Sequence, residues 1–152
     1  MGLLGTFRRR PFLTPTEREQ IDAGLATARR HAEAPIGLFI DERAAPDPEI
    51  RARQLLRAWD LSERDRQRAV LVYACAATRR FAVVGGDEIR RVAPTAFWDN
   101  LHRDLTRHFE EHRYCDGLFK AIADVAIMLA SVNVASDCFH PQPPPRPEGS
   151  DP

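Results

Sequence analysis

The stretch AVLVYACAATRRFAVVGGDE, residues 69–88, decides the fold. Its first part, Ala69–Ala76, is almost wholly apolar, which is typical of a strand covered on both faces at the centre of a sheet. Thr78 and Arg79 form a short turn before a second apolar run, Phe81–Gly85. Because so short a connection cannot hold a crossover, the two runs are predicted to pair as an antiparallel hairpin.

Helical patterns flank a further strand on the N-terminal side of this hairpin. Thr14, Pro15 and Glu17 form a capping box with proline at the first helical position, so a helix is predicted to begin there. The run Ile36–Ile40 follows as a short buried strand. Asp47 then repeats the capping pattern before a second amphipathic helix.

Two longer helices are predicted after the hairpin. The segment PTAFWDNLHRDLTRHFEEH, residues 94–112, carries one apolar face at helical spacing, and Asp116 is predicted to cap a last apolar helix. The face consists of Phe97, Leu101, Leu105, His108, Phe109 and His112. With helices on both sides of the strands, we predict an α/β fold: a three-layer α/β/α sandwich around a small mixed sheet of three to four strands.

The length of 152 residues and the hydrophobic content of 43% suit a single domain with a sizeable core. We predict an N-terminal extension over residues 1–11, a domain over residues 12–138 and a disordered, proline-rich tail over residues 139–152.

Charge and hydropathy narrow the classes of partner. The 22 basic and 22 acidic side chains cancel, so nucleic acid is not an expected partner. The longest apolar run is broken by Asp124 and falls short of the roughly 20 residues that a membrane span needs. An odd number of cysteines and an N-terminus without a secretory pattern indicate a cytoplasmic protein with reduced thiols. The sequence does not indicate an oligomeric state.

From residue 12 to about residue 141 the chain resembles the TPM domain family, named partly for a thylakoid-lumen phosphatase, in its short, soluble, bacterial branch. The resemblance is carried by FLTPTEREQI, by the hairpin AVLVYACAATRRFAVVG, and by the closing helical half EIRRVAPTAFWDNLHRDLTRHFEEHRYCDGLFKAIADV. It implies an α/β/α sandwich, and it implies phosphatase activity with a divalent cation.

The chain departs from the polar signature of the relatives that it resembles. An asparagine-glycine pair is usual before the central strand, where this chain has Arg68 and Ala69, and an acid is usual where Thr78 stands. The acid that follows the second strand is displaced by one place, to Asp87. These changes remove much of the polar rim that would hold a cation or phosphate, and they indicate a degenerate site.

Acidic residues near the ends of the strands are the candidate metal ligands. Asp87 and Glu88, which follow the paired glycines, could bind Ca²⁺ or Mg²⁺. If a metal site exists, Asp41 and Glu42 at the end of the first strand are their expected partners in space, although a solvated turn is the favoured interpretation of these two residues. Asp87 and Glu88 also fit a simpler interpretation, in which the glycines allow an unusual backbone turn and the acids favour a helix start. We favour the simpler interpretation.

Histidine spacing suggests a second metal hypothesis. His108 and His112 lie four residues apart on one helix, with Cys115 nearby, which is a spacing that zinc sites use. The set supplies three ligands at most and lies on an apolar face. We therefore favour partly buried histidines held by hydrogen bonds.

We favour a binding module with a degenerate metal or phosphate site that acts through a partner protein. The alternative is a divalent-cation-dependent phosphatase in which Asp41, Asp87 and Glu88 hold the ion, bound water attacks, and Arg79 stabilises the phosphoryl charge. A Ca²⁺-binding regulator without catalysis is a third possibility. The sequence leaves open whether the protein is an enzyme.

Overall fold

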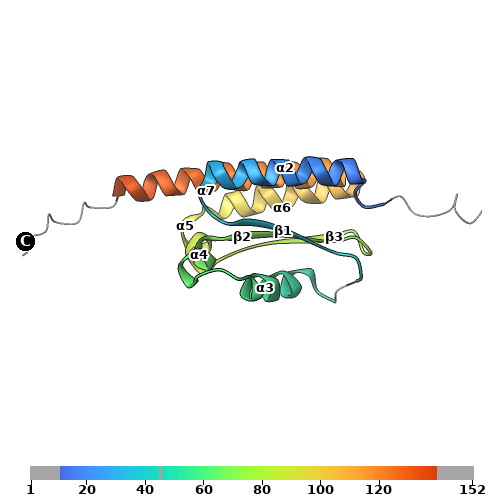
Figure 1. The fold of residues 1–152 in the computed structure, drawn as a ribbon, viewed down its shortest axis with the longest axis horizontal. Coiled ribbons are helices and arrows are strands. Elements are labelled where there is room, and N and C mark those ends of the chain that lie inside the picture. The colour runs from blue at the N-terminus through green and yellow to red at the C-terminus, as the bar shows by residue number, and fades with distance from the viewer. Residues whose placement is uncertain (1–10, 45, 140–152) are drawn as a thin grey trace, which may run out of the picture.

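The computed structural model describes residues 11–44 and 46–139, and a three-stranded mixed sheet lies at its centre (Figure 1). The middle strand β2 is parallel to β1 on one side and antiparallel to β3 on the other. The strands are β1 (Ile36–Asp41), β2 (Val70–Cys75) and β3 (Arg80–Gly85). The predicted central strand, the hairpin and the mixed sheet are therefore confirmed.

The larger core lies between one face of the sheet and three helices, which form a single layer in Figure 1. These helices are α2 (Pro15–Ala32), α6 (Thr95–Glu110) and α7 (Tyr114–Phe139). Alternate residues of β2, namely Val70, Val72 and Ala74, face this core. Helix α7 is long, and its C-terminal part projects beyond the sheet (Figure 1).

The opposite face of the sheet packs against α3 (Pro48–Ala58). The other residues of β2, Leu71, Tyr73 and Cys75, lie in this smaller core. All six residues of β2 are buried, as expected for a strand covered on both faces. The α/β/α sandwich is thus confirmed.

Local signals at the helix starts agree with the structure. Thr14 Oγ1 accepts a hydrogen bond from the Glu17 amide at 3.1 Å, and the Glu17 carboxylate accepts one from the Thr14 amide at 2.9 Å. Asp47 caps α3 in the predicted way. One helix was not predicted: α4 (Glu63–Arg68), which Ser62 caps, buries no residue and so has no apolar stripe in the sequence.

The α6–α7 connection differs from the prediction. Helix α6 ends at Glu110, and His112 lies in the turn with a left-handed φ of 58°. Asp116 lies in the first turn of α7, which begins two residues earlier, at Tyr114, so it is not the cap. The predicted extension and tail lie outside the described residues, except Pro11 and Phe139. Within residues 11–44 and 46–139, no helix has the length and apolar character of a membrane span.

Candidate functional site

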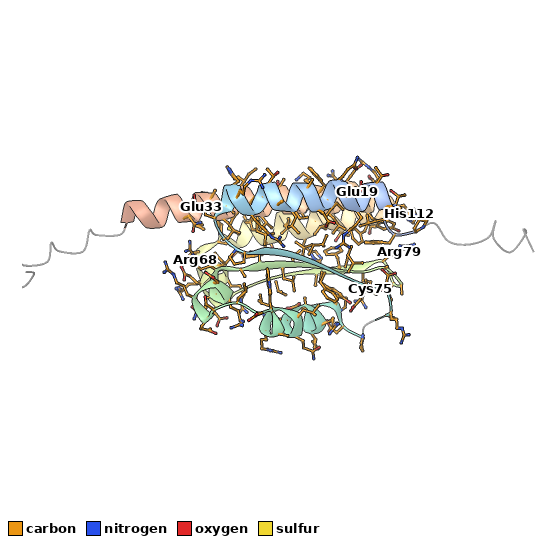
Figure 2. The ribbon with its side chains drawn as sticks, viewed as in Figure 1. Glu19, Glu33, Arg68, Cys75, Arg79 and His112 are labelled. Atoms are coloured by element: carbon orange, nitrogen blue, oxygen red, sulfur yellow. The ribbon has the colours of Figure 1, made fainter. Side chains whose placement is uncertain are left out.

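The sheet has two ends, and the sequence-predicted site residues are divided between them. Asp41, Cys75 and Arg80 are register partners at one end, which we call the hairpin end. Val70 and Gly85 are register partners at the other, which we call the glycine end. Figure 2 shows Cys75 and Arg79 at the hairpin end of the sheet and Arg68 at the opposite end of the molecule.

Asp41 at the hairpin end is engaged by two neighbours. The Arg51 guanidinium donates to both carboxylate oxygens, at 2.9 Å and 3.4 Å, and the Tyr73 hydroxyl donates to one of them at 2.7 Å. The hydrogen bond from Arg51, opposed by burial and aided by Tyr73, lowers the pKa of Asp41. The Arg51 guanidinium therefore balances the negative charge of Asp41, so this carboxylate is poorly suited to hold a cation.

The glycine junction has a structural explanation that differs from the expected one. No glycine among the described residues has a positive φ, and Gly86 has φ −65°. A Cβ atom on Gly86 would lie 2.1 Å from the carbonyl oxygen of Arg66 and 2.5 Å from the carbonyl carbon of Gln67. The Gly86 amide also donates to the Ala69 carbonyl oxygen at 2.9 Å. Glycine is needed here for close backbone approach, and the expectation of an unusual backbone angle is wrong.

Asp87 and Glu88 begin the short helix α5 (Asp87–Val92), as the simpler interpretation predicted. The Asp87 side chain is 83% exposed, and its nearest cation, Arg90, is 4.0 Å away. Because β3 runs antiparallel to β2, these acids lie at the glycine end, about 17 Å of strand away from Asp41. The structure therefore does not bring Asp41 together with Asp87 and Glu88, and the three carboxylates cannot share one ion.

The two histidines of the zinc hypothesis lie in different environments. His108 is buried, and its Nδ1 donates to the Asp104 carbonyl oxygen at 2.7 Å, as the hydrogen-bonded interpretation predicted. His112 is exposed, contrary to its expected place on the apolar face, and its Nδ1 lies 2.9 Å from the Tyr114 hydroxyl. Within the described residues, no three His, Cys, Asp or Glu side chains are grouped so as to hold a metal ion.

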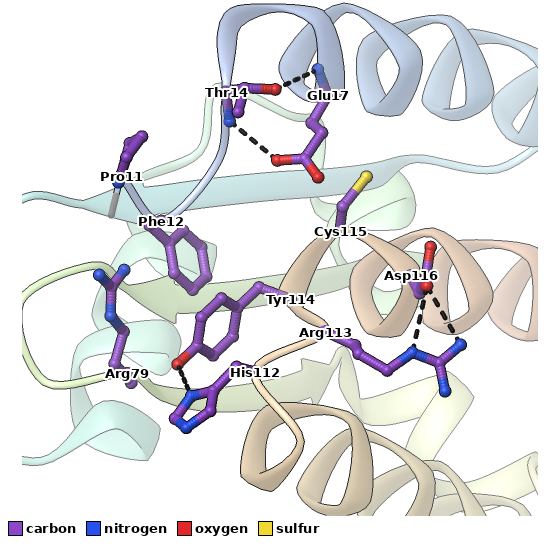
Figure 3. A pocket seen from close by; sticks show the side chains of 10 residues that line it. All are labelled: Pro11, Phe12, Thr14, Glu17, Arg79, His112, Arg113, Tyr114, Cys115 and Asp116. Atoms are coloured by element: carbon purple, nitrogen blue, oxygen red, sulfur yellow. Dashed lines mark hydrogen bonds and ion pairs between the residues drawn. The ribbon is translucent and has the colours of Figure 1, made fainter. Parts of the chain in front are cut away.

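A cavity of about 520 Å³ opens at the hairpin end, and we call it the hairpin pocket (Figure 3). Three segments far apart in the sequence meet there: the start of α2, the β2–β3 turn and the α6–α7 turn. It is lined by Pro11, Phe12, Thr14, Glu17, Arg79, His112, Arg113, Tyr114, Cys115 and Asp116.

Arg79 is held between aromatic rings in this pocket. It occupies the turn of the hairpin with φ 58°, and its guanidinium carbon lies 5.3 Å from the ring centre of Phe12 and 5.1 Å from that of Tyr114. Phe12 and Phe109 complete an aromatic cluster around Tyr114. Cation–π contacts of this kind orient a guanidinium and support its charge.

Several other polar groups of the hairpin pocket are paired. The Asp116 carboxylate accepts a hydrogen bond of 3.1 Å from Arg113, and Glu17 takes part in the α2 capping box. Burial, followed by the charges of Glu17 and Asp116, raises the pKa of the Cys115 thiol. A raised pKa makes the thiolate, which is the nucleophilic form of a cysteine, less available at Cys115.

The sequence singled out Arg79, His112 and Cys115, but for other roles and not as one site. Phe12 and Tyr114 carried no signal, since an aromatic residue beside a helix start is usually core. Their meeting depends on tertiary packing between the ends of α2, α6 and α7.

Comparison with known proteins identifies a family for this chain and solved structures with a similar fold. The model of the TPM domain matches residues 8–127. The BA42 protein of the psychrophilic bacterium Bizionia argentinensis has an NMR structure similar to this one, with 22% identity, TM-score 0.69, and coverage of 82% of this chain and 86% of that one.

Two further NMR structures have the same fold. An N-terminal domain from P. gingivalis is 17% identical with TM-score 0.64 and covers 80% of this chain and 78% of that one. The N-terminal domain of cg2496 from Corynebacterium glutamicum is 14% identical with TM-score 0.56, over 76% and 72% of the two chains. The comparison with curated proteins found no match.

Proposed function

The chain belongs to the TPM domain family, and from this premise we propose that it is a non-catalytic binding module that recognises a partner protein through the hairpin pocket. The observation that carries the proposal is the separation of the candidate metal ligands: Asp41 lies at one end of the sheet, bound by Arg51, and Asp87 lies at the other. A metal-activated water needs several oxygen ligands around one ion.

The composition of the hairpin pocket supports recognition of a protein segment. Arginine and tyrosine are enriched where binding energy is concentrated in protein interfaces. Here Arg79 and Tyr114 are positioned together by rigid elements, and a cavity of about 520 Å³ has room for a few side chains. Since Asp116 is already paired with Arg113, the pocket suits a segment that presents an acidic or aromatic side chain.

The competing function is a phosphatase that depends on Ca²⁺ or Mg²⁺. Calorimetric titration with each ion and a phosphate-release assay with an aryl phosphate separate the two functions. We expect neither saturable cation binding nor phosphate release above the buffer rate. Phosphate release that is lost in both Asp41→Asn and Arg79→Ala would overturn the proposal.

A photocrosslinking residue placed at His112 tests partner recognition in cells of the source organism. We expect a discrete adduct with a protein, lost when Arg79→Ala is added. Gln54, exposed on α3 away from the hairpin pocket, is the matched control position and should give no such adduct. Equal adducts from both positions, or none from His112, would contradict recognition through this pocket.

A further inference from the structure

A second cavity, of about 460 Å³, opens at the glycine end, and arginines from three helices line it. We call it the arginine pocket. Arg53 and Arg57 come from α3, Arg66 from α4 and Arg90 from α5. It lies across the molecule from the hairpin pocket, so its ligand is independent of the proposed function.

Positive charge is in excess in the arginine pocket. Its lining holds four arginines and two carboxylates, Glu63 and Asp87, although the whole chain has no net charge. The two carboxylate side chains are 72% and 83% exposed, so solvent screens much of their charge. Arg53 is paired with Glu49 at 2.7 Å and Arg66 with Glu63 at 3.0 Å. By contrast, Arg90 is 4.0 Å from Asp87, and no carboxylate of the described residues lies within ion-pair distance of Arg57.

The frame of the arginine pocket is fixed before any ligand arrives. Arg66 is anchored, because its Nη2 donates to the carbonyl oxygens of Trp59 and Leu61, each at 2.9 Å. The tight contact of Gly86 with the backbone of Arg66 locks α4 against the start of α5. Arg57 and Arg90 therefore project from elements whose relative positions are set, which lowers the entropy cost of binding.

We propose that the arginine pocket binds a small phosphorylated anion through a diphosphate group. Guanidinium groups present planar pairs of donors that match phosphate oxygens, and they form charge-assisted hydrogen bonds. A diphosphate carries enough negative charge to pair with Arg57, which has no carboxylate partner among the described residues, and with Arg90, whose partner is 4.0 Å away. It also has more acceptor oxygens than a single phosphate, so it can accept hydrogen bonds from more of the arginines in the lining.

Calorimetric titration of the full chain with pyrophosphate and with inorganic phosphate tests this proposal. We expect saturable binding of pyrophosphate, weaker binding of phosphate, and a weakening of both as ionic strength rises towards about 0.15 M. The double variant Arg57→Gln/Arg90→Gln should weaken pyrophosphate binding about tenfold or more, because it removes two charge-assisted contacts. Arg66 is left intact because it also holds the fold.

The matched control is Arg18→Gln/Arg30→Gln, which removes the same charge from the exposed face of α2. Its pyrophosphate affinity should stay within about twofold of the parent, since α2 lies outside the pocket. Thermal unfolding of both variants verifies that they fold. An absence of saturable pyrophosphate binding would overturn the proposal, and so would equal weakening in the two double variants.

ADP as a third titrant distinguishes the source of the diphosphate. Tighter binding of ADP than of pyrophosphate would assign a nucleotide, with the nucleoside contributing contacts in the cavity. Equal or weaker binding of ADP would assign the diphosphate alone. The hairpin-pocket variant Arg79→Ala should leave every one of these affinities unchanged, which separates this inference from the proposed function.

Discussion

The Tyr73 hydroxyl donates a 2.7 Å hydrogen bond to the Asp41 carboxylate, which joins two neighbouring strands on the α3 side of the sheet. Tyr73 is fully buried, and Arg51 reaches the same carboxylate from α3. A residue that the sequence offered only as a candidate metal ligand therefore ties the middle strand to the smaller helical layer. Its role in the fold can be measured directly.

Asp41→Ala is expected to lower the free energy of unfolding by about 2–3 kcal/mol, because it leaves a buried hydroxyl without an acceptor and Arg51 without its partner. Asp41→Asn, which keeps an acceptor, should cost less. Urea unfolding measures both. Asp22→Ala breaks only the exposed pair with Arg18 and should cost about 0–1 kcal/mol. If Asp41→Ala cost no more than this control, the structural role would be refuted.

Stability should fall in acid through two carboxylates. The hydrogen bond from Arg51 lowers the pKa of Asp41, and the hydrogen bond from Lys120 lowers the pKa of Asp104. A folded pKa below the unfolded value of about 4 gives stabilisation that is present above pH 4 and lost as the pH falls through the folded pKa.

Urea unfolding between about pH 5 and pH 2.5 measures this loss. The variant Asp41→Asn/Asp104→Asn should show a smaller change over that range than the parent, since two of the linked groups are gone. An identical pH profile in parent and variant would contradict the assignment.

Much of the fold follows from local sequence signals. The apolar run of β2 has only one environment that suits it, a strand covered on both faces, and the capping box at Thr14 fixes the start of α2 without tertiary help. Helix α4 was not predicted because it has six residues and buries none of them, so the sequence shows no periodic apolar pattern there.

The site was harder to predict than the fold. The proximity of Asp41 and Asp87 that a metal site would need conflicts with the predicted hairpin, because a strand antiparallel to β2 carries its C-terminal end away from that of β1. The space around Gly86 and the meeting of Phe12 with Arg79 depend on contacts between distant segments, for which a single sequence holds no periodic signal.

Tyr73 is expected to resist ionisation in the folded state. Burial, followed by its hydrogen bond to Asp41, raises the pKa of Tyr73. A raised folded pKa gives stabilisation that is complete below the unfolded value of about 10 and is lost as the pH rises above it. In Tyr114→Phe, Tyr73 is the sole tyrosine, so absorbance at 295 nm should rise only when the chain unfolds at high pH. An increase while circular dichroism still reports the folded state would contradict this prediction.

Gly86→Ala separates two explanations for the glycine junction. If Gly86 were present only for its conformational freedom, alanine would be tolerated at its φ of −65° and ψ of 169° and would stabilise the fold by about 0.4–1 kcal/mol. The 2.1 Å distance between an added Cβ and the Arg66 carbonyl oxygen instead predicts a loss of about 3 kcal/mol or more, or failure to fold, because backbone cannot move aside as a side chain can.

Gly85→Ala is the control for Gly86→Ala, since its Cβ would meet the Trp98 ring at 3.1 Å and a ring can shift. Urea unfolding of both should therefore give a much larger loss at Gly86, and a gain in stability there would show that α4 and α5 are not packed as closely as the structure has them.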